Sequence, residues 1–161
     1  MNDLALFILR IVAGSYMVTH GRPKLRDTDG EYAKSFESLG FHPGSTFVRR
    51  AGLVETLSGV LIALGALGPA GPMMLLADMI VAATSVSARE KAFKPSKHEV
   101  EALYASIAVL LIASGPGKIS ADSALGIRAF DRAWVRQLAL GAALAGAAFM
   151  LSQRTPSSPN T

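Results

Sequence analysis

Long apolar runs separated by short polar stretches dominate the pattern of the chain. Three of the runs each hold one charged residue: Arg10 in 4–18, Glu55 in 51–68 and Asp78 in 73–87. A charge near the centre of a lipid-spanning helix costs at least about 2.5 kcal/mol, so such residues usually have partners. The pattern therefore predicts membrane helices whose charged side chains meet in a buried polar site.

The same pattern, with its turn residues, predicts an all-α fold. The expected long helices are residues 2–20, 45–68, 73–88, 98–114 and 133–152. Pro23 is expected to end the first helix, because proline cannot continue the hydrogen-bond ladder, and Ser45 to cap the second. The uncharged turn 68–72 joins the second and third helices into a hairpin. The first four helices form the predicted integral membrane bundle.

The last apolar stretch, residues 133–152, predicts a fifth helix. Its length matches the roughly 20 residues that are needed to span a bilayer. A helix lying along the bundle or the membrane interface is the alternative. Two pairs of small residues in it have the spacing that lets helices approach closely: Gly141/Ala145 and Ala142/Gly146.

The polar connection after the first helix contains its own helical signal. Tyr32, Phe36 and Leu39 have the spacing of a short amphipathic helix that lies on a membrane surface. The predicted organisation has three parts: a four-helix membrane domain at 1–122, a connecting segment with the additional apolar helix at 123–152, and a polar tail at 153–161, expected to be flexible.

Composition supports a membrane protein and excludes several chemistries. Charged residues make up 17% of the chain, against about 25% in soluble proteins. The chain has no cysteine, which excludes thiol chemistry and cysteine-ligated metal centres within it. The net charge of +4 comes from basic residues that flank apolar runs, so we expect a lipid bilayer as partner and no nucleic acid.

Loop charges predict an orientation. Lysine and arginine gather in loops 21–50 and 89–98, whereas the turn 68–72 has none. The positive-inside rule places those two loops in the cytoplasm and the N-terminus on the other side.

The three charges inside the apolar runs lie at comparable depths. Arg10 and Asp78 each lie ten residues from the loop side, or about 15 Å deep at 1.5 Å per residue, and Glu55 lies about 8 Å deep. We therefore expect one buried cluster of a cation and two acids. It is either an ion pair that fixes helix packing, or a site that exchanges protons or binds a quinone.

A second candidate site lies at the headgroup level on the same side. It consists of His20 and His98, which stand at predicted helix ends, and of Lys24 in the loop after the first helix. This patch would receive a quinone head or dock a partner; the alternative is that the two histidines face each other as haem ligands. No metal motif and no nucleophile–base triad stands out.

Several short motifs, taken in order, resemble the DoxX family of small membrane proteins. The matching pieces are Leu9-Arg10, His20-Gly21 with Lys24, Ser38-Leu39-Gly40-Phe41, Gly52-Leu53-Val54-Glu55 with Ser58-Gly59, and residues 115–122. The resemblance covers about residues 4–122. It implies a four-helix membrane bundle, in a bacterial inner membrane, linked to quinone-connected redox systems. One branch of the family resembles the small subunit of thiosulfate:quinone oxidoreductase.

The resemblance also implies candidate functional residues. Carried over by position, they are Arg10, His20, Lys24, Glu55 and Asp122. The family's usual Ser-Leu-Asp ending reads Ser120-Ala121-Asp122 here, and an extra apolar segment follows. These departures favour a subunit role over independent catalysis.

Three functions are therefore open. The first is an accessory subunit of a quinone-linked redox complex, with other membrane subunits as partners, a bound quinone and no intrinsic cofactor. The alternative is a non-catalytic structural or assembly subunit of a larger respiratory or photosynthetic complex. The third is a small transporter, for which short helices without a visible repeat leave little room.

Overall fold

The structure, a computed structural model, describes residues 2–155, and this part of the chain is helical and contains no β-strand. Its long helices are α1 (Asp3–Leu25), α3 (Gly44–Leu64), α4 (Ala70–Glu90), α5 (Glu99–Ser114) and α7 (Ala133–Ser152). The short elements are α2 (Glu31–Ser38), α6 (Ala121–Ala124) and the 3-10 turns η1 (Pro95–Lys97) and η2 (Ala129–Asp131). The predicted all-α class is confirmed.

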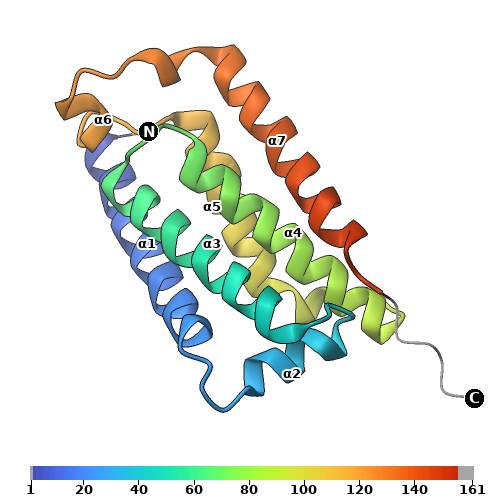
Figure 1. Cartoon of the computed structure of the whole chain (residues 1–161). Coiled ribbons are helices and arrows are strands. Elements are labelled where there is room, and N and C mark those ends of the chain that lie inside the picture. Colours follow the sequence, from blue (N-terminus) through green and yellow to red (C-terminus); the bar gives the residue numbers. More distant parts are fainter. Residues whose placement is uncertain (1, 156–161) are drawn as a thin grey trace, which may run out of the picture.

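The long helices run up and down side by side (Figure 1). α1 packs mainly on α3, α4 packs on both α3 and α5, and α7 covers the outer side of α4. α2 lies across one end of the molecule and α6 at the other, near the N-terminus. The loops predicted to be cytoplasmic, 21–50 and 89–98, both lie at the α2 end.

Three of the described helices are long and apolar enough to cross a membrane: α1, α4 and α7. The 16 residues of α5 extend about 24 Å, less than the roughly 30 Å of a hydrocarbon core. α3 carries Arg49, Arg50 and Glu55. The predicted count of four spanning helices plus a fifth is therefore not confirmed, although α7 has the bounds and the length that were expected.

Glycines let α1 and α3 pack at backbone contact. A Cβ at Gly21 would lie 2.6 Å from the Gly52 carbonyl oxygen, and a Cβ at Gly52 would lie 2.9 Å from that of Gly21. Seven residues away on both helices, a Cβ at Gly14 would collide with the Gly59 carbonyl oxygen, and a Cβ at Gly59 would collide with that of Gly14. Small residues at facing positions are the usual means by which membrane helices approach closely.

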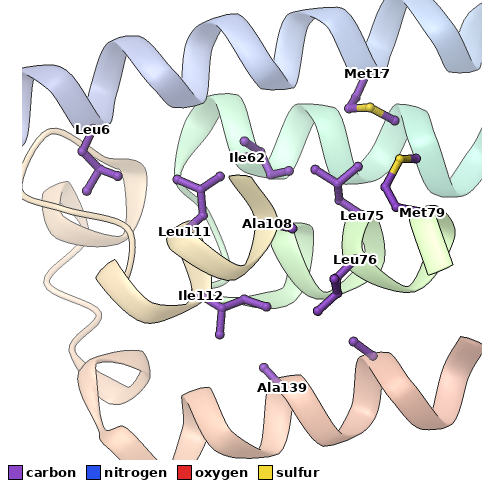
Figure 2. Packing of buried hydrophobic residues seen from close by; sticks show 11 residues of the cluster. Leu6, Met17, Ile62, Leu75, Leu76, Met79, Ala108, Leu111, Ile112 and Ala139 are labelled. Atoms are coloured by element: carbon purple, nitrogen blue, oxygen red, sulfur yellow. The ribbon is translucent and has the colours of Figure 1, made fainter. Parts of the chain in front are cut away.

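The apolar core lies between α1 and α7, with α3, α4 and α5 in the middle (Figure 2). Its buried members are Leu6, Met17, Ile62, Leu75, Leu76, Met79, Ala108, Leu111, Ile112, Ala139 and Ala143. α7 contributes a stripe of alanines: Ala139, Ala143 and Ala147. A Cβ at Gly141 or Gly146 would meet no atom within 4 Å, so the contact between α7 and α4 does not use these glycines.

Three predicted helix boundaries are wrong. α1 continues through Pro23 to Leu25, because its packing on α3 extends past His20 to the contact between Gly21 and Gly52. α3 starts at Gly44 with Pro43 at its cap, so Ser45 lies inside it. The predicted turn 68–72 is shifted: α3 ends in the left-handed Gly65, and Pro72 sits in the first turn of α4, where no backbone donor is needed.

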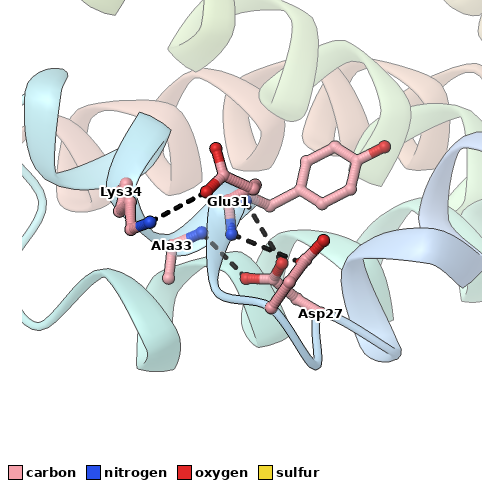
Figure 3. Close-up of polar contacts among 6 residues, drawn as sticks. Asp27, Glu31, Ala33 and Lys34 are labelled. Carbon is pink, nitrogen blue, oxygen red and sulfur yellow. Dashed lines mark hydrogen bonds and ion pairs between the residues drawn. The ribbon is translucent and has the colours of Figure 1, made fainter.

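The predicted short helix is present as α2, with Leu39 at its C-cap. The Asp27 carboxylate accepts hydrogen bonds from the N–H groups of Tyr32 at 3.2 Å and Ala33 at 2.8 Å (Figure 3). These bonds fix the first turn of α2, whose backbone donors have no partners within the helix. On its exposed side, a hydrogen bond with Glu31 raises the pKa of Lys34 above its ordinary value.

Candidate functional site: a cavity with a polar cluster

A cavity of about 960 Å³ lies among α1, α2, α3, α4, α5 and α7. Its walls are predominantly apolar and include five methionines: Met17, Met73, Met74, Met79 and Met150. α2 covers one side of it through Tyr32 and Phe36. An apolar cavity of this size with a few polar groups is the usual form of a small-molecule site.

The polar cluster in the cavity wall consists of Lys24, Glu55 and Asp78. The Lys24 ammonium group forms an ion pair with Glu55 Oε1. The side chain of Lys24 is 19% exposed and that of Glu55 is 5% exposed. Asp78 is half-buried and lies beside the Glu55 carboxyl group, within electrostatic reach of Lys24. The predicted meeting of Glu55 with Asp78 is thus observed.

The cation of this cluster comes from the extension of α1 past its predicted end. Lys24 stands in the last turn of α1, and a Cβ at Gly52 would lie 3.0 Å from the Lys24 Cβ. The bare backbone at Gly52 therefore lets Lys24 lie across α3 toward Glu55. The seven-residue spacing that Gly14 and Gly21 share with Gly52 and Gly59 is the sequence signal for this packing.

One acceptor atom of the cluster has no partner. Buried Glu55 Oε2 accepts no hydrogen bond from any residue between 2 and 155. A buried acceptor left unpaired costs about 1–3 kcal/mol, so this atom is available for a donor that occupies the cavity.

Arg10 does not join this cluster, which corrects the expectation of one cation with Glu55 and Asp78. Its guanidinium donates hydrogen bonds to the carbonyl oxygens of Pro116, at 2.7 Å, and Ile119. It also lies against Gly65, ten residues or about 15 Å along α3 from Glu55. The estimate from the sequence counted the depth of Arg10 from His20 as the end of the first helix. Because α1 continues to Leu25, Arg10 lies further from the loop side than that estimate placed it.

Asp122 lies at the same end of the molecule as Arg10. Its buried carboxylate accepts hydrogen bonds from the N–H groups of Leu67, at 2.9 Å, and Gly68, at 2.6 Å, and it lies within electrostatic reach of Arg10. The Arg10–Asp122 cluster thus ties the segment after α5 to α1 and to the turn between α3 and α4. The contacts named for these two side chains are with backbone groups or with each other.

The predicted headgroup-side patch is divided in the structure. His20 is exposed and lines the cavity together with Lys24. His98 is buried: its Nε2 lies 2.9 Å from Ser87 Oγ, and its ring stacks on Phe93. The other ring nitrogen, Nδ1, has no hydrogen-bond partner among residues 2–155. No group of three or more His, Asp or Glu side chains within residues 2–155 is arranged to hold a metal ion.

The end of α7 is fastened to the α2 side of the cavity. Arg154 Nε donates to the Leu39 carbonyl oxygen at 2.8 Å, and the Thr155 N–H donates to that of Gly40 at 2.9 Å. Gln153 Oε1 accepts from Arg50 at 3.3 Å. Of the predicted tail 153–161, these residues are therefore held in place, and residues 156–161 lie outside the described part of the chain.

Comparison with known proteins agrees with this architecture. No curated protein and no solved structure matches the chain. The family model described as DoxX matches residues 5–88, which is more than half of the 161 residues. The match includes all of α2 and α3 and nearly all of α1 and α4. The matched region contains the whole Lys24–Glu55–Asp78 cluster. The chain is an integral membrane protein that belongs to the DoxX family.

Proposed function

We propose that the chain is a membrane subunit of a quinone-linked redox complex and that the cavity binds the quinone. The observation that carries this proposal is the placement of Lys24, Glu55 and Asp78 in the wall of an otherwise apolar cavity. A lipid-soluble quinone has the matching division into a polar head and an apolar tail.

The size and walls of the cavity support a ligand of this class. Its volume of about 960 Å³ lies at the upper end of the usual range for small-molecule sites, roughly 300–1,000 Å³. Methionine side chains are flexible and polarizable, and they adapt to irregular apolar ligands. The five cavity methionines therefore suit an isoprenoid chain.

The polar cluster supports proton exchange with the quinone head. Two carboxyl groups that share a site ionise together only at a high cost, because their like charges repel each other. The Lys24 ammonium group balances one negative charge, so the cluster has room for one exchangeable proton between Glu55 and Asp78. Such a proton can be passed to a quinone oxygen, and Lys24 can donate a hydrogen bond to it.

The same proposal includes an orientation. The basic loops 21–50 and 89–98 lie at the α2 end, which the positive-inside rule assigns to the cytoplasm of a bacterial inner membrane. Lys24 and the exposed His20 then connect the cluster to that side. Protons would be taken up from the cytoplasm.

Quinone binding to the purified chain in lipid nanodiscs tests the proposal. We expect saturable binding of a short-tailed ubiquinone analogue, and about ten-fold weaker binding after Glu55→Gln, equal to about 1.4 kcal/mol. Glu31→Gln removes an exposed partner of Lys34 and serves as the matched control. Absence of binding to the wild-type chain would refute the proposal.

A structural subunit is the second candidate, and the outer face of α7 favours it. Trp134, Leu138 and Leu144 are each more than half exposed on this helix. Purification from the native membrane in a gentle detergent, with mass spectrometry of proteins and quinones, separates the two functions. Release of partner subunits by Ala145→Phe, without quinone bound to this chain, would support the structural role.

A further inference from the structure

We propose that the quinone enters the cavity sideways, from the bilayer, between α3 and α7, and that Gly146 keeps this entrance open. The inference rests on the proposed function and adds the route and the residue that controls it. It starts from the side chains at the rim of the cavity.

Four large apolar residues line the cavity and are also exposed on the outside: Tyr32 of α2, Val100 of α5, and the pair Leu53 and Phe149, which stand on the two helices that flank the proposed entrance. Leu53 of α3 is 51% exposed and Phe149 of α7 is 67% exposed. A side chain that belongs both to the wall of a cavity and to the outer surface stands at an opening. Because the outer surface of this membrane protein is apolar at these positions, the opening faces lipid.

Polar contacts close the same side of the molecule toward the loops. Arg50 lies one turn before Leu53 and is hydrogen-bonded to Gln153, which lies one turn after Phe149. The backbone of Thr155 is bonded to Gly40 just beyond. α3 and α7 are therefore held together next to α2 and separate one turn deeper in the membrane.

Gly146 lies in the wall of this entrance. It lines the cavity, and a Cβ built on it would meet no atom within 4 Å. The position therefore has room for a side chain, and glycine leaves that room to a ligand. Gly141 of the same helix has equally open surroundings but does not belong to the cavity wall.

This pair of glycines provides a matched experiment. Quinone loading is measured by stopped-flow mixing of nanodiscs that contain the chain with quinone-loaded vesicles. Gly146→Phe places a ring in the entrance and is expected to slow loading at least about five-fold, as expected when access to a site is obstructed. Gly141→Phe is expected to load at the wild-type rate. Phe149→Ala widens the entrance and is expected to speed loading.

The outcomes distinguish this inference from the function on which it rests. If the wild-type chain binds no quinone, the proposed function fails and the entrance fails with it. If the wild type loads quinone and both Gly146→Phe and Phe149→Ala leave the rate unchanged, the function stands and the sideways entrance is wrong. Should Gly146→Phe fail to fold, as judged by size-exclusion chromatography, Phe149→Ala alone decides between these results.

Discussion

Two clusters of buried charge lie about 15 Å apart in this bundle, and they differ in what surrounds them. The guanidinium of Arg10 and the carboxylate of Asp122 are bonded to backbone groups of the loops at one end, and Arg10 Nε is the one polar atom of this pair without a partner among residues 2–155. In the Lys24–Glu55–Asp78 cluster, Glu55 keeps a buried oxygen without a hydrogen-bond partner, and Asp78 faces a large cavity.

The difference indicates different tasks for the same kinds of side chain. A buried charge that is bonded to several backbone groups fixes the chain in place, and losing it leaves those backbone groups unpaired. A charge in a cavity wall with an open acceptor is available to a ligand. Stability should therefore depend on the first cluster and ligand binding on the second.

Asp122→Ala should have the largest effect on stability. The N–H groups of Leu67 and Gly68 lose their acceptor, at about 1–3 kcal/mol for each buried donor left unpaired. We expect the free energy of unfolding to fall by about 3 kcal/mol, measured by denaturant titration in detergent micelles. Ser123→Ala, at the exposed neighbouring position, should leave it nearly unchanged. An equally stable Asp122→Ala would contradict a structural role.

Arg10→Gln should be somewhat milder. Glutamine is too short to reach both carbonyl oxygens, at Pro116 and Ile119, that the guanidinium binds. One or both acceptors lose a charge-assisted bond, which is worth about 1.5–3 kcal/mol. We expect a loss of about 2 kcal/mol by the same titration and unchanged quinone affinity. A large loss of quinone affinity at wild-type stability would instead place Arg10 in the ligand site.

Glu55→Gln should affect quinone binding more than the stability of the fold. Asp78 remains beside Lys24 as a negative partner, and the partly exposed ammonium group keeps access to water. The loss of stability should therefore be about 1 kcal/mol, far below the roughly 3–5 kcal/mol for a buried ion pair without a substitute. Glu55→Gln,Asp78→Asn removes both acids and should cost more than the sum of the single changes, since each acid replaces the other.

Glu31→Gln should have the smallest effect. Glu31 and Lys34 are 68% and 70% exposed, and water screens such pairs. The pKa of Lys34 is raised by Glu31, so the contribution of the pair is present below the ordinary lysine pKa and disappears at higher pH. Melting curves of this variant at pH 7 should match the wild type. A clear loss would mean that α2 is held by charge rather than by the Asp27 cap.

The sequence predicted the helices well, because their apolar runs are long and their turns contain glycine and proline. It also predicted that Glu55 and Asp78 meet. It assigned the wrong cation to them, because Pro23 suggested that α1 ends before Lys24. The backbone contacts of Gly14 and Gly21 with α3 outweigh the cost of a proline in the last turn.

Other features of the site depend on long-range packing. The cavity arises because α7 rests on α4 through Ala139, Ala143 and Ala147 and separates from α3. Nothing in the local pattern distinguishes those alanines from the other small residues of α7, and the predicted pairs at Gly141 and Gly146 are not used in packing within the chain. The burial of His98 against Ser87 likewise follows only from the pairing of α4 with α5.

The most direct test of the two tasks is the thermal shift that a quinone produces in the purified chain. A ligand at 100 times its Kd stabilises the folded state by about 2.7 kcal/mol. We expect a rise in Tm for the wild type and for Arg10→Gln, which starts from a lower Tm, and little or no rise for Glu55→Gln. A rise of equal size in Glu55→Gln, or a rise lost only in Arg10→Gln, would contradict the division between a structural cluster and a ligand-binding cluster.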